Sequence, residues 1–173
     1  MYKNDNDKKL AVLAALFAFL IFTLVSCGKE MSELRGGTRD IAQRIYERTG
    51  MDARNMDEEE ISSSESYILG IEEMHFLDKI EKACIYRPTV LSAAQSLCVV
   101  ETKSEKYADE IFEEMNDNYE WAPCDPAESA VFMKYGKYII LCKDSSACVR
   151  TVAEAFGAET DGGARTRFSQ NPM

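Results

Sequence analysis

Six cysteines and one histidine are the residues of this 173-residue chain whose types are best suited to nucleophilic chemistry. A cysteine thiolate can attack a carbonyl group when a neighbouring histidine takes up the thiol proton. The single histidine, His75, lies in Met74-His75-Phe76, which matches no catalytic motif and is typical of a partly buried structural histidine. A small surface thiol-dependent hydrolase that combines His75 with Cys124 or Cys142 is therefore kept as an alternative hypothesis.

Cys27 ends a segment with the pattern of a lipoprotein signal peptide. Three lysines in the first nine residues precede an uncharged apolar run, LAVLAALFAFLIFTLVS, over residues 10–26. The run ends in Leu24-Val25-Ser26-Cys27-Gly28, a lipobox with a branched apolar residue three positions before the cysteine and a small residue just before it. We therefore expect residues 1–26 to be a cleaved signal peptide and the Cys27 thiol to form a thioether to diacylglycerol.

An uncleaved transmembrane helix is the alternative interpretation of the same segment, because its 17 apolar residues approach the roughly 20 that span a bilayer. In both cases the lysines before the run hold the N-terminus inside the cell. Both interpretations place the remainder of the chain on the extracytoplasmic face of the cell membrane. A lipid on Cys27 would make the membrane itself the first partner.

The chain is acidic, with a formal net charge of -10. Such a charge repels nucleic acid and anionic lipid surfaces, so a role in binding DNA or RNA is disfavoured.

Five cysteines remain once Cys27 is set aside, and their spacing is irregular. No two are separated by two residues, as redox and zinc motifs require, and an odd number indicates that some are unpaired thiols. A bridge between Cys142 and Cys148 stays open as an alternative. The five are Cys84, Cys98, Cys124, Cys142 and Cys148.

Two acidic stretches contain the carboxylate and amide groups that bind calcium, but neither has the spacing of a calcium loop. Residues 57–60 (DEEE) and 116–120 (NDNYE) both lack the turn glycine and the terminal glutamate of that loop. We interpret both as solvated surfaces, and the sequence predicts no metal ion or cofactor. Trp121, the only tryptophan, follows the second stretch and is either a core anchor or an exposed loop aromatic residue that binds a partner or a sugar.

Strand and helix patterns alternate in the second half of the chain. They predict a strand over residues 96–102, a helix capped by Ser104, a hairpin of residues 130–133 and 138–142, and a last helix capped by Asp144 or Ser145. Near the N-terminus, Thr38 can cap a helix that Gly50 ends. The structure of residues 51–95, which include the short apolar segment 67–71, stays undecided from the sequence.

These elements indicate one domain with segments of low apolar content on either side. Residues 27–37 predict a flexible tether and residues 158–173 a disordered tail, which leaves a single globular domain over residues 38–157. The order strand, helix, hairpin, helix favours an α+β fold, a small antiparallel sheet with helices packed mainly on one face.

The pattern as a whole resembles a family of small lipoproteins of Gram-positive bacteria, classified as domain of unknown function 4358. The resemblance covers most of the chain after Cys27. It rests on the lipobox and on residues 67–71 (YILGI), 96–115 (SLCVVETKSEKYADEIFEEM) and 130–144 (AVFMKYGKYIILCKD). It implies an extracytoplasmic anchored protein, and it carries over no functional residue beyond Cys27.

The leading hypothesis is a non-enzymatic envelope lipoprotein that binds an envelope protein or a cell-wall component, because the sequence holds no phosphate loop, histidine cluster or nucleophile motif. The solute receptor of an importer is disfavoured, since such receptors resemble two-lobed proteins and this chain supplies one lobe at most. Oligomeric state stays undetermined at this level.

The lipid attachment is directly testable. We expect radiolabelled palmitate to enter the wild-type chain expressed in a Gram-positive host and not the Cys27→Ser variant, because only the thiol can form the thioether. Autoradiography of the immunoprecipitated protein measures this. Equal labelling of both proteins would show that Cys27 is not the acceptor.

Overall fold

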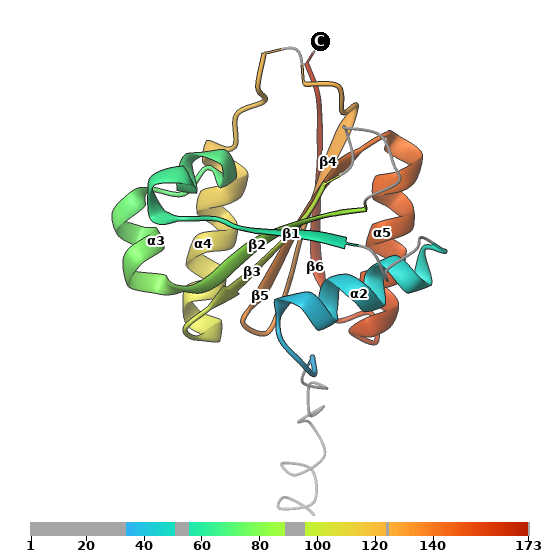
Figure 1. The fold of residues 1–173 in the computed structure, drawn as a ribbon, viewed down its shortest axis with the longest axis horizontal. Coiled ribbons are helices and arrows are strands. Elements are labelled where there is room, and N and C mark those ends of the chain that lie inside the picture. The colour runs from blue at the N-terminus through green and yellow to red at the C-terminus, as the bar shows by residue number, and fades with distance from the viewer. Residues whose placement is uncertain (1–33, 51–55, 89–95, 124, 173) are drawn as a thin grey trace, which may run out of the picture. The chain divides into compact units, whose positions relative to one another are not determined.

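Six strands form one antiparallel sheet in the computed structural model, which describes residues 34–50, 56–88, 96–123 and 125–172. Cys27, the predicted signal peptide and Cys124 lie outside the described residues. The strand order is β1-β2-β3-β5-β4-β6 (Figure 1). The strands are β1 (Met56–Glu60), β2 (Ile80–Pro88), β3 (Ser96–Thr102), β4 (Ser129–Tyr135), β5 (Tyr138–Asp144) and β6 (Arg165–Gln170).

The central strands β3, β5 and β4 are buried on both faces of the sheet. Successive side chains of a strand point to opposite faces, so a strand that is apolar at every position needs a cover on each side. Along β5, Ile140 and Cys142 belong to one apolar cluster, whereas Ile139 and Leu141 belong to the other. The sheet is therefore the middle layer of three.

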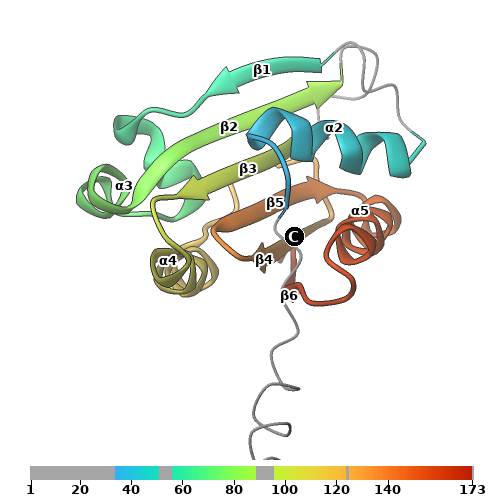
Figure 2. The ribbon, with the colours of Figure 1, turned by 90° about the horizontal axis from the view of Figure 1, so that it is seen from below.

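Helices supply the two outer layers (Figure 2). One face is covered by α2 (Thr38–Arg48) and α5 (Ser146–Glu159), and we call it the α2/α5 face. The other, which we call the α4 face, is covered by η1 (Ser63–Leu69), α3 (Glu73–Lys79) and α4 (Glu105–Asn118).

The predicted α+β class and the antiparallel sheet are confirmed. The expectation that the helices pack mainly on one face is wrong, because both faces carry a helical layer. The continuous apolar runs of β3 and β5 already contained this information: an antiparallel strand with one wet face alternates apolar and polar residues, and these strands do not.

The helix caps fall close to their predicted positions. The Ser104 hydroxyl accepts a hydrogen bond from the Tyr107 N–H at the start of α4, and Ser145 accepts one from the Cys148 N–H at the start of α5. At α2 the cap is Gly37, one residue before the predicted Thr38.

The predicted disordered tail is wrong for residues 165–170, which form β6 beside β4. The strand contains one large apolar residue, Phe168, so its sequence carries no strand pattern. Its arginines hold it in place instead: Arg165 and Arg167 both pair with the Glu113 carboxylate, at 2.5 and 2.8 Å, and both guanidinium groups lie over the Phe112 ring of α4.

The region left undecided by the sequence contains β1, η1, α3 and β2. The acidic stretch 57–60 belongs to β1, an edge strand whose residues after Met56 are exposed. Charged side chains on an edge strand oppose pairing with another chain, so the acidic composition suits this position.

The end of the predicted tether is docked onto the domain. The Tyr138 hydroxyl donates to the Gly36 carbonyl oxygen at 2.9 Å, and Leu34 packs against the apolar cluster of the α2/α5 face. The chain therefore enters the domain beside the start of β5. These two contacts hold the last residues of the predicted tether, and the rest of it lies outside the described residues.

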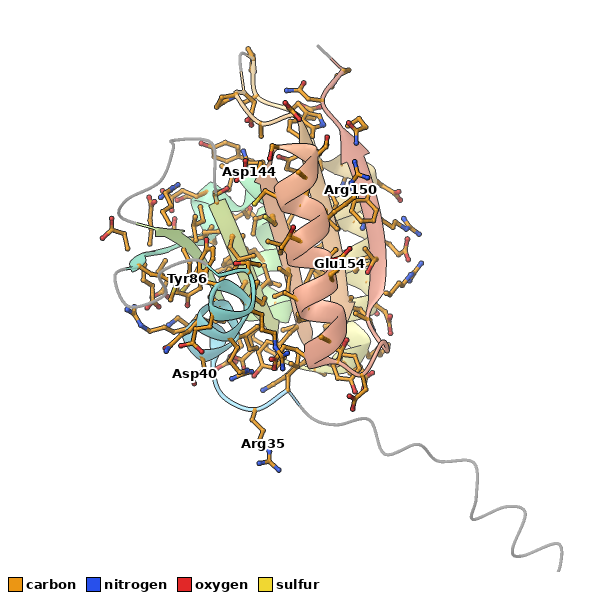
Figure 3. All side chains as sticks on the ribbon, turned by 90° about the vertical axis from the view of Figure 1, so that its right-hand side faces the viewer. Arg35, Asp40, Tyr86, Asp144, Arg150 and Glu154 are labelled. Carbon is orange, nitrogen blue, oxygen red and sulfur yellow. The ribbon has the colours of Figure 1, made fainter. Side chains whose placement is uncertain are left out.

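Glu58 joins α2 to the first two strands through one carboxylate. Its oxygens accept hydrogen bonds from Arg39 of α2 at 2.8 Å and from Lys82 of β2 at 3.0 Å, beside Tyr86, which lies under α2 (Figure 3). The side chain is only 24% exposed although β1 is an edge strand. The hydrogen bond from Arg39, then that from Lys82, lowers the Glu58 pKa to about 2, against the opposing effect of burial.

Glu58→Gln should therefore lower the free energy of unfolding at pH 7 by about 1 to 2 kcal/mol, after discounting for the exposed cations. A carboxyl group with a lowered pKa contributes stability above its unfolded pKa, and this contribution is lost as the pH falls. The difference between the two proteins should accordingly shrink between pH 4.5 and 2. Urea unfolding at a series of pH values measures it.

Glu59→Gln is the matched control, because Glu59 makes an exposed ion pair with Arg87 on the same strand pair. We expect this variant to change the stability by less than about 0.5 kcal/mol. A pH-independent difference for Glu58→Gln would contradict the assigned role of its charge.

Candidate functional site

His75 braces two helices against each other. Its Nδ1 lies 2.8 Å from Oε2 of Glu114 on α4, and the other oxygen of that carboxylate accepts the backbone N–H of Glu72, also at 2.8 Å. Glu114 thereby holds the start of α3 by a backbone group and a ring nitrogen at once. His75 and Glu114 therefore connect α3 to α4.

The structure does not bring Cys142 to His75. Cys142 is part of the apolar cluster on the α2/α5 face, whereas His75 pairs with α4 on the opposite face of the sheet. Cys124, the other thiol of the hydrolase hypothesis, lies outside the described residues.

Three further cysteines occupy structural positions. Cys84 is buried on the α2/α5 face and Cys98 on the α4 face, while Cys148 lies half-buried on α5. Burial raises the pKa of the Cys84, Cys98 and Cys142 thiols, and a protonated thiol is a poor nucleophile. Cys84, Cys98 and Cys142 are therefore packing residues of the two apolar clusters.

The acidic stretches do not assemble a metal site within the described part of the chain, where no group of three or more histidine, cysteine, aspartate or glutamate side chains converges. Residues 57–60 are spread along β1. Asn116 is inside α4, and its amide donates to the Phe112 carbonyl oxygen of the preceding turn.

The main functional candidate is a groove of about 580 Å³ on the α4-face side of the domain. One wall is the end of η1 and the turn that follows it, and the other is the connection after α4; Lys143 of β5 lies between them. We call it the aromatic groove. It is lined by Tyr67, Ile68, Gly70, Ile71, Glu72, Asn118, Tyr119, Glu120, Trp121, Ala122, Pro123 and Lys143.

Gly70 holds the two walls at close approach. It ends η1 with φ of +72°, a left-handed conformation that glycine adopts without strain. A Cβ atom at this position would lie 2.8 Å from the Tyr119 backbone nitrogen and 2.9 Å from the Asn118 carbonyl carbon. No other residue type would let the two backbones meet here.

Three aromatic rings connect the core to the groove. Phe132 of β4 contacts Tyr119 edge to face, with ring centroids 5.2 Å apart, and Tyr119 contacts Trp121 in the same way at 5.6 Å. Such packing fixes the orientation of each ring. Trp121 is thus neither a core residue nor a loosely attached one: it is half-buried at the wall of the groove.

The C-terminal residues support this wall through hydrogen bonds. The Trp121 indole N–H donates to the Ser169 hydroxyl of β6 at 3.3 Å, and the Asn171 amide donates to the carbonyl oxygens of Asp125 and Ala127. The segment predicted to be a disordered tail therefore positions one side of the site.

Lys143 forms an ion pair within the domain. Its ammonium group lies 2.8 Å from the Asp125 carboxylate, whose side chain is 6% exposed. Burial favours the neutral acid, but the hydrogen bonds from Lys143 and from the Ala127 N–H outweigh it, so the pKa of Asp125 is lowered. The positive charge at the base of the groove is thereby neutralised.

The sequence indicates the parts of the groove separately and does not predict the site. Residues 67–71 stand out as apolar and Trp121 as a loop aromatic residue, but about 50 positions separate them in the chain. The signal that could have joined them is Gly70, a glycine directly after an apolar run, which indicates a close approach of another backbone.

Comparisons with models of known protein families, with curated protein sequences and with solved structures found no significant match. Among the described residues, no helix has the length and apolar character that crossing a membrane requires.

Gly70→Ala should destabilise the domain more than Gly50→Ala does. Gly50 has a similar φ of +77°, but a Cβ atom at that position would lie in open space, so its replacement isolates the cost of the left-handed backbone, about 1 to 2 kcal/mol. The clash at Gly70 should add about 1 to 3 kcal/mol. Thermal or urea unfolding compares the two variants.

The same pair of variants reports on the groove. Gly70→Ala should also shift the fluorescence of Trp121, since the walls must separate, while Gly50→Ala should leave it unchanged. Equal stability and unchanged emission for both variants would mean that Gly70 does not hold the walls together.

Proposed function

We propose that this chain is an extracytoplasmic lipoprotein, anchored to the cell membrane through Cys27, whose aromatic groove binds a partner in the cell envelope without chemical conversion. The single observation that carries the binding role is the groove itself, a concave site lined by aromatic side chains whose two walls meet at Gly70.

The place of the groove in the domain supports this role. The chain enters beside Tyr138, at the start of β5, and α4 also begins at that end, where the Thr102 N–H donates to the Lys137 carbonyl oxygen. The groove lies at the end of α4, a helix of 14 residues and so roughly 20 Å away. A domain tethered at its entry would hold the groove away from its anchor.

The placement of the described reactive groups supports a non-enzymatic role. The three buried thiols and the His75–Glu114 pair do not meet at a common point. The resemblance to small Gram-positive lipoproteins, which is a prediction from the sequence, agrees with an anchored binding protein. The competing candidate is a hydrolase that uses Cys124 with His75.

Site-specific photo-crosslinking in intact cells tests the proposal on the full, anchored chain. A photoreactive phenylalanine in place of the exposed Tyr67 should give a discrete adduct, because the side chain stands at the mouth of the groove. The same group at Glu154, which lies on the outward side of α5 (Figure 3), is the control position and should give none.

His75→Ala and Cys124→Ser separate binding from catalysis. A binding protein should keep its adduct and its envelope phenotype with either variant, whereas a hydrolase should lose the phenotype with both. Trp121→Ala should abolish the adduct. The proposal fails if no adduct forms at Tyr67, or if it forms equally at Glu154.

A further inference from the structure

The surface beside the aromatic groove is unusually apolar. Among the described residues, four of the five large hydrophobic side chains that are exposed lie on η1 and α3. They are Tyr67 (74% exposed), Met74 (65%), Leu77 (54%) and Ile68 (37%). Exposed apolar side chains gathered in one place mark an interaction surface, whereas single ones do not.

These side chains lie on two neighbouring helices, and we call them the apolar track. Met74 and Leu77 are three positions apart on α3, so they share one side of that helix. Tyr67 and Ile68 line the groove at the end of η1, which packs against α3. The track therefore runs from the groove along the outside of α3.

Carboxylates are the unpaired charges of the groove. Glu72 and Glu120 line it, both are exposed, and no ion pair reaches either of them from the described part of the chain. The lining lysine, Lys143, is neutralised by Asp125. A ligand in the groove thus meets negative charge beside aromatic side chains, a combination that favours a cation.

We propose that the aromatic groove binds a basic peptide segment in which lysine or arginine alternates with aliphatic residues. The cationic side chains pair with Glu72 and Glu120 and lie against Tyr67 and Trp121, while the aliphatic side chains cover Ile68 and the track on α3. This inference rests on the proposed function and names the chemical class of its partner.

Two other occupants fit the surface less well. A neutral glycan could stack on the aromatic rings, but its hydroxyl groups would leave the aliphatic side chains Met74 and Leu77 uncovered. An anionic lipid surface would be repelled by Glu72 and Glu120. The aliphatic track and the unpaired carboxylates together favour the peptide.

The test uses the full-length protein in a nonionic detergent and a blocked hexapeptide that alternates leucine and arginine. Isothermal titration calorimetry gives the affinity, and the fluorescence of Trp121, the only tryptophan, reports whether the peptide occupies the groove. We expect binding that weakens as sodium chloride is raised from about 50 to about 500 mM, roughly in step with charge screening.

The double variant Glu72→Gln/Glu120→Gln should weaken this binding roughly 2- to 30-fold, the range for two ion pairs at an exposed surface. The matched control Asp57→Asn/Glu154→Gln removes the same charge from exposed positions outside the groove and should change the affinity less than about 2-fold. A peptide with glutamine for arginine should bind the wild type weakly and lose nothing further on the double variant.

Each contrary result overturns a defined part of the proposal. Equal weakening by both double variants would show unspecific attraction to an acidic protein. Binding of chitotetraose, a neutral oligosaccharide, with no binding of the peptide would make the groove a glycan site. If neither probe binds while the Tyr67 crosslink still forms in cells, the basic-peptide proposal is wrong and the proposed binding function stands. If the crosslink is also absent, the basic-peptide proposal and the proposed binding function are both wrong.

Discussion

Burial of β3, β5 and β4 on both faces is the constraint on which the rest of this structure depends. A strand such as β5, with Ile139, Ile140 and Leu141 in succession, exposes apolar surface on two sides and is stable only between two helical layers. The chain supplies α2 and α5 for one side and η1, α3 and α4 for the other. The same layering separates Cys142 from His75, because a side chain on one face of the sheet cannot reach a side chain on the other. Cys142 and His75 are therefore parts of two different packing arrangements.

The elements that were predictable are those whose residues carry their own pattern. The strand over 96–102, the hairpin around Gly136 and the helices capped by Ser104 and Ser145 follow from local spacing and caps, and they are present. The edge strands were not predictable in this way. β1 is acidic and β6 is rich in arginine, and both are strands because β2 and β4 offer unpaired backbone groups beside them. Whether a polar segment becomes a strand depends on its neighbour in space, which composition does not record.

The candidate site shows the same division between local and non-local information. Trp121 and residues 67–71 have recognisable character, but the groove exists because the backbone at Gly70 touches that at Tyr119 and because Ser169 accepts a hydrogen bond from the indole. Each of these contacts joins segments about 50 residues apart. The predicted lipobox is the opposite case, since a processing enzyme would recognise it as a linear sequence. This is why the sequence indicates a location for the protein much more directly than a binding site.

The entry of the chain and the aromatic groove lie at opposite ends of α4. Near its start, the Tyr138 hydroxyl at the beginning of β5 donates to the Gly36 carbonyl oxygen, which attaches the entry of the chain to a central strand. At its end, Asn118 and Tyr119 form the wall of the groove, which Asn171 and Ser169 brace from the C-terminal side. The first described residues thus contact the start of β5 on the α2/α5 face, and the last ones support the wall of the groove. A partner bound in the groove would contact the wall that β6 supports, at the opposite end of α4 from the place where the chain enters the domain.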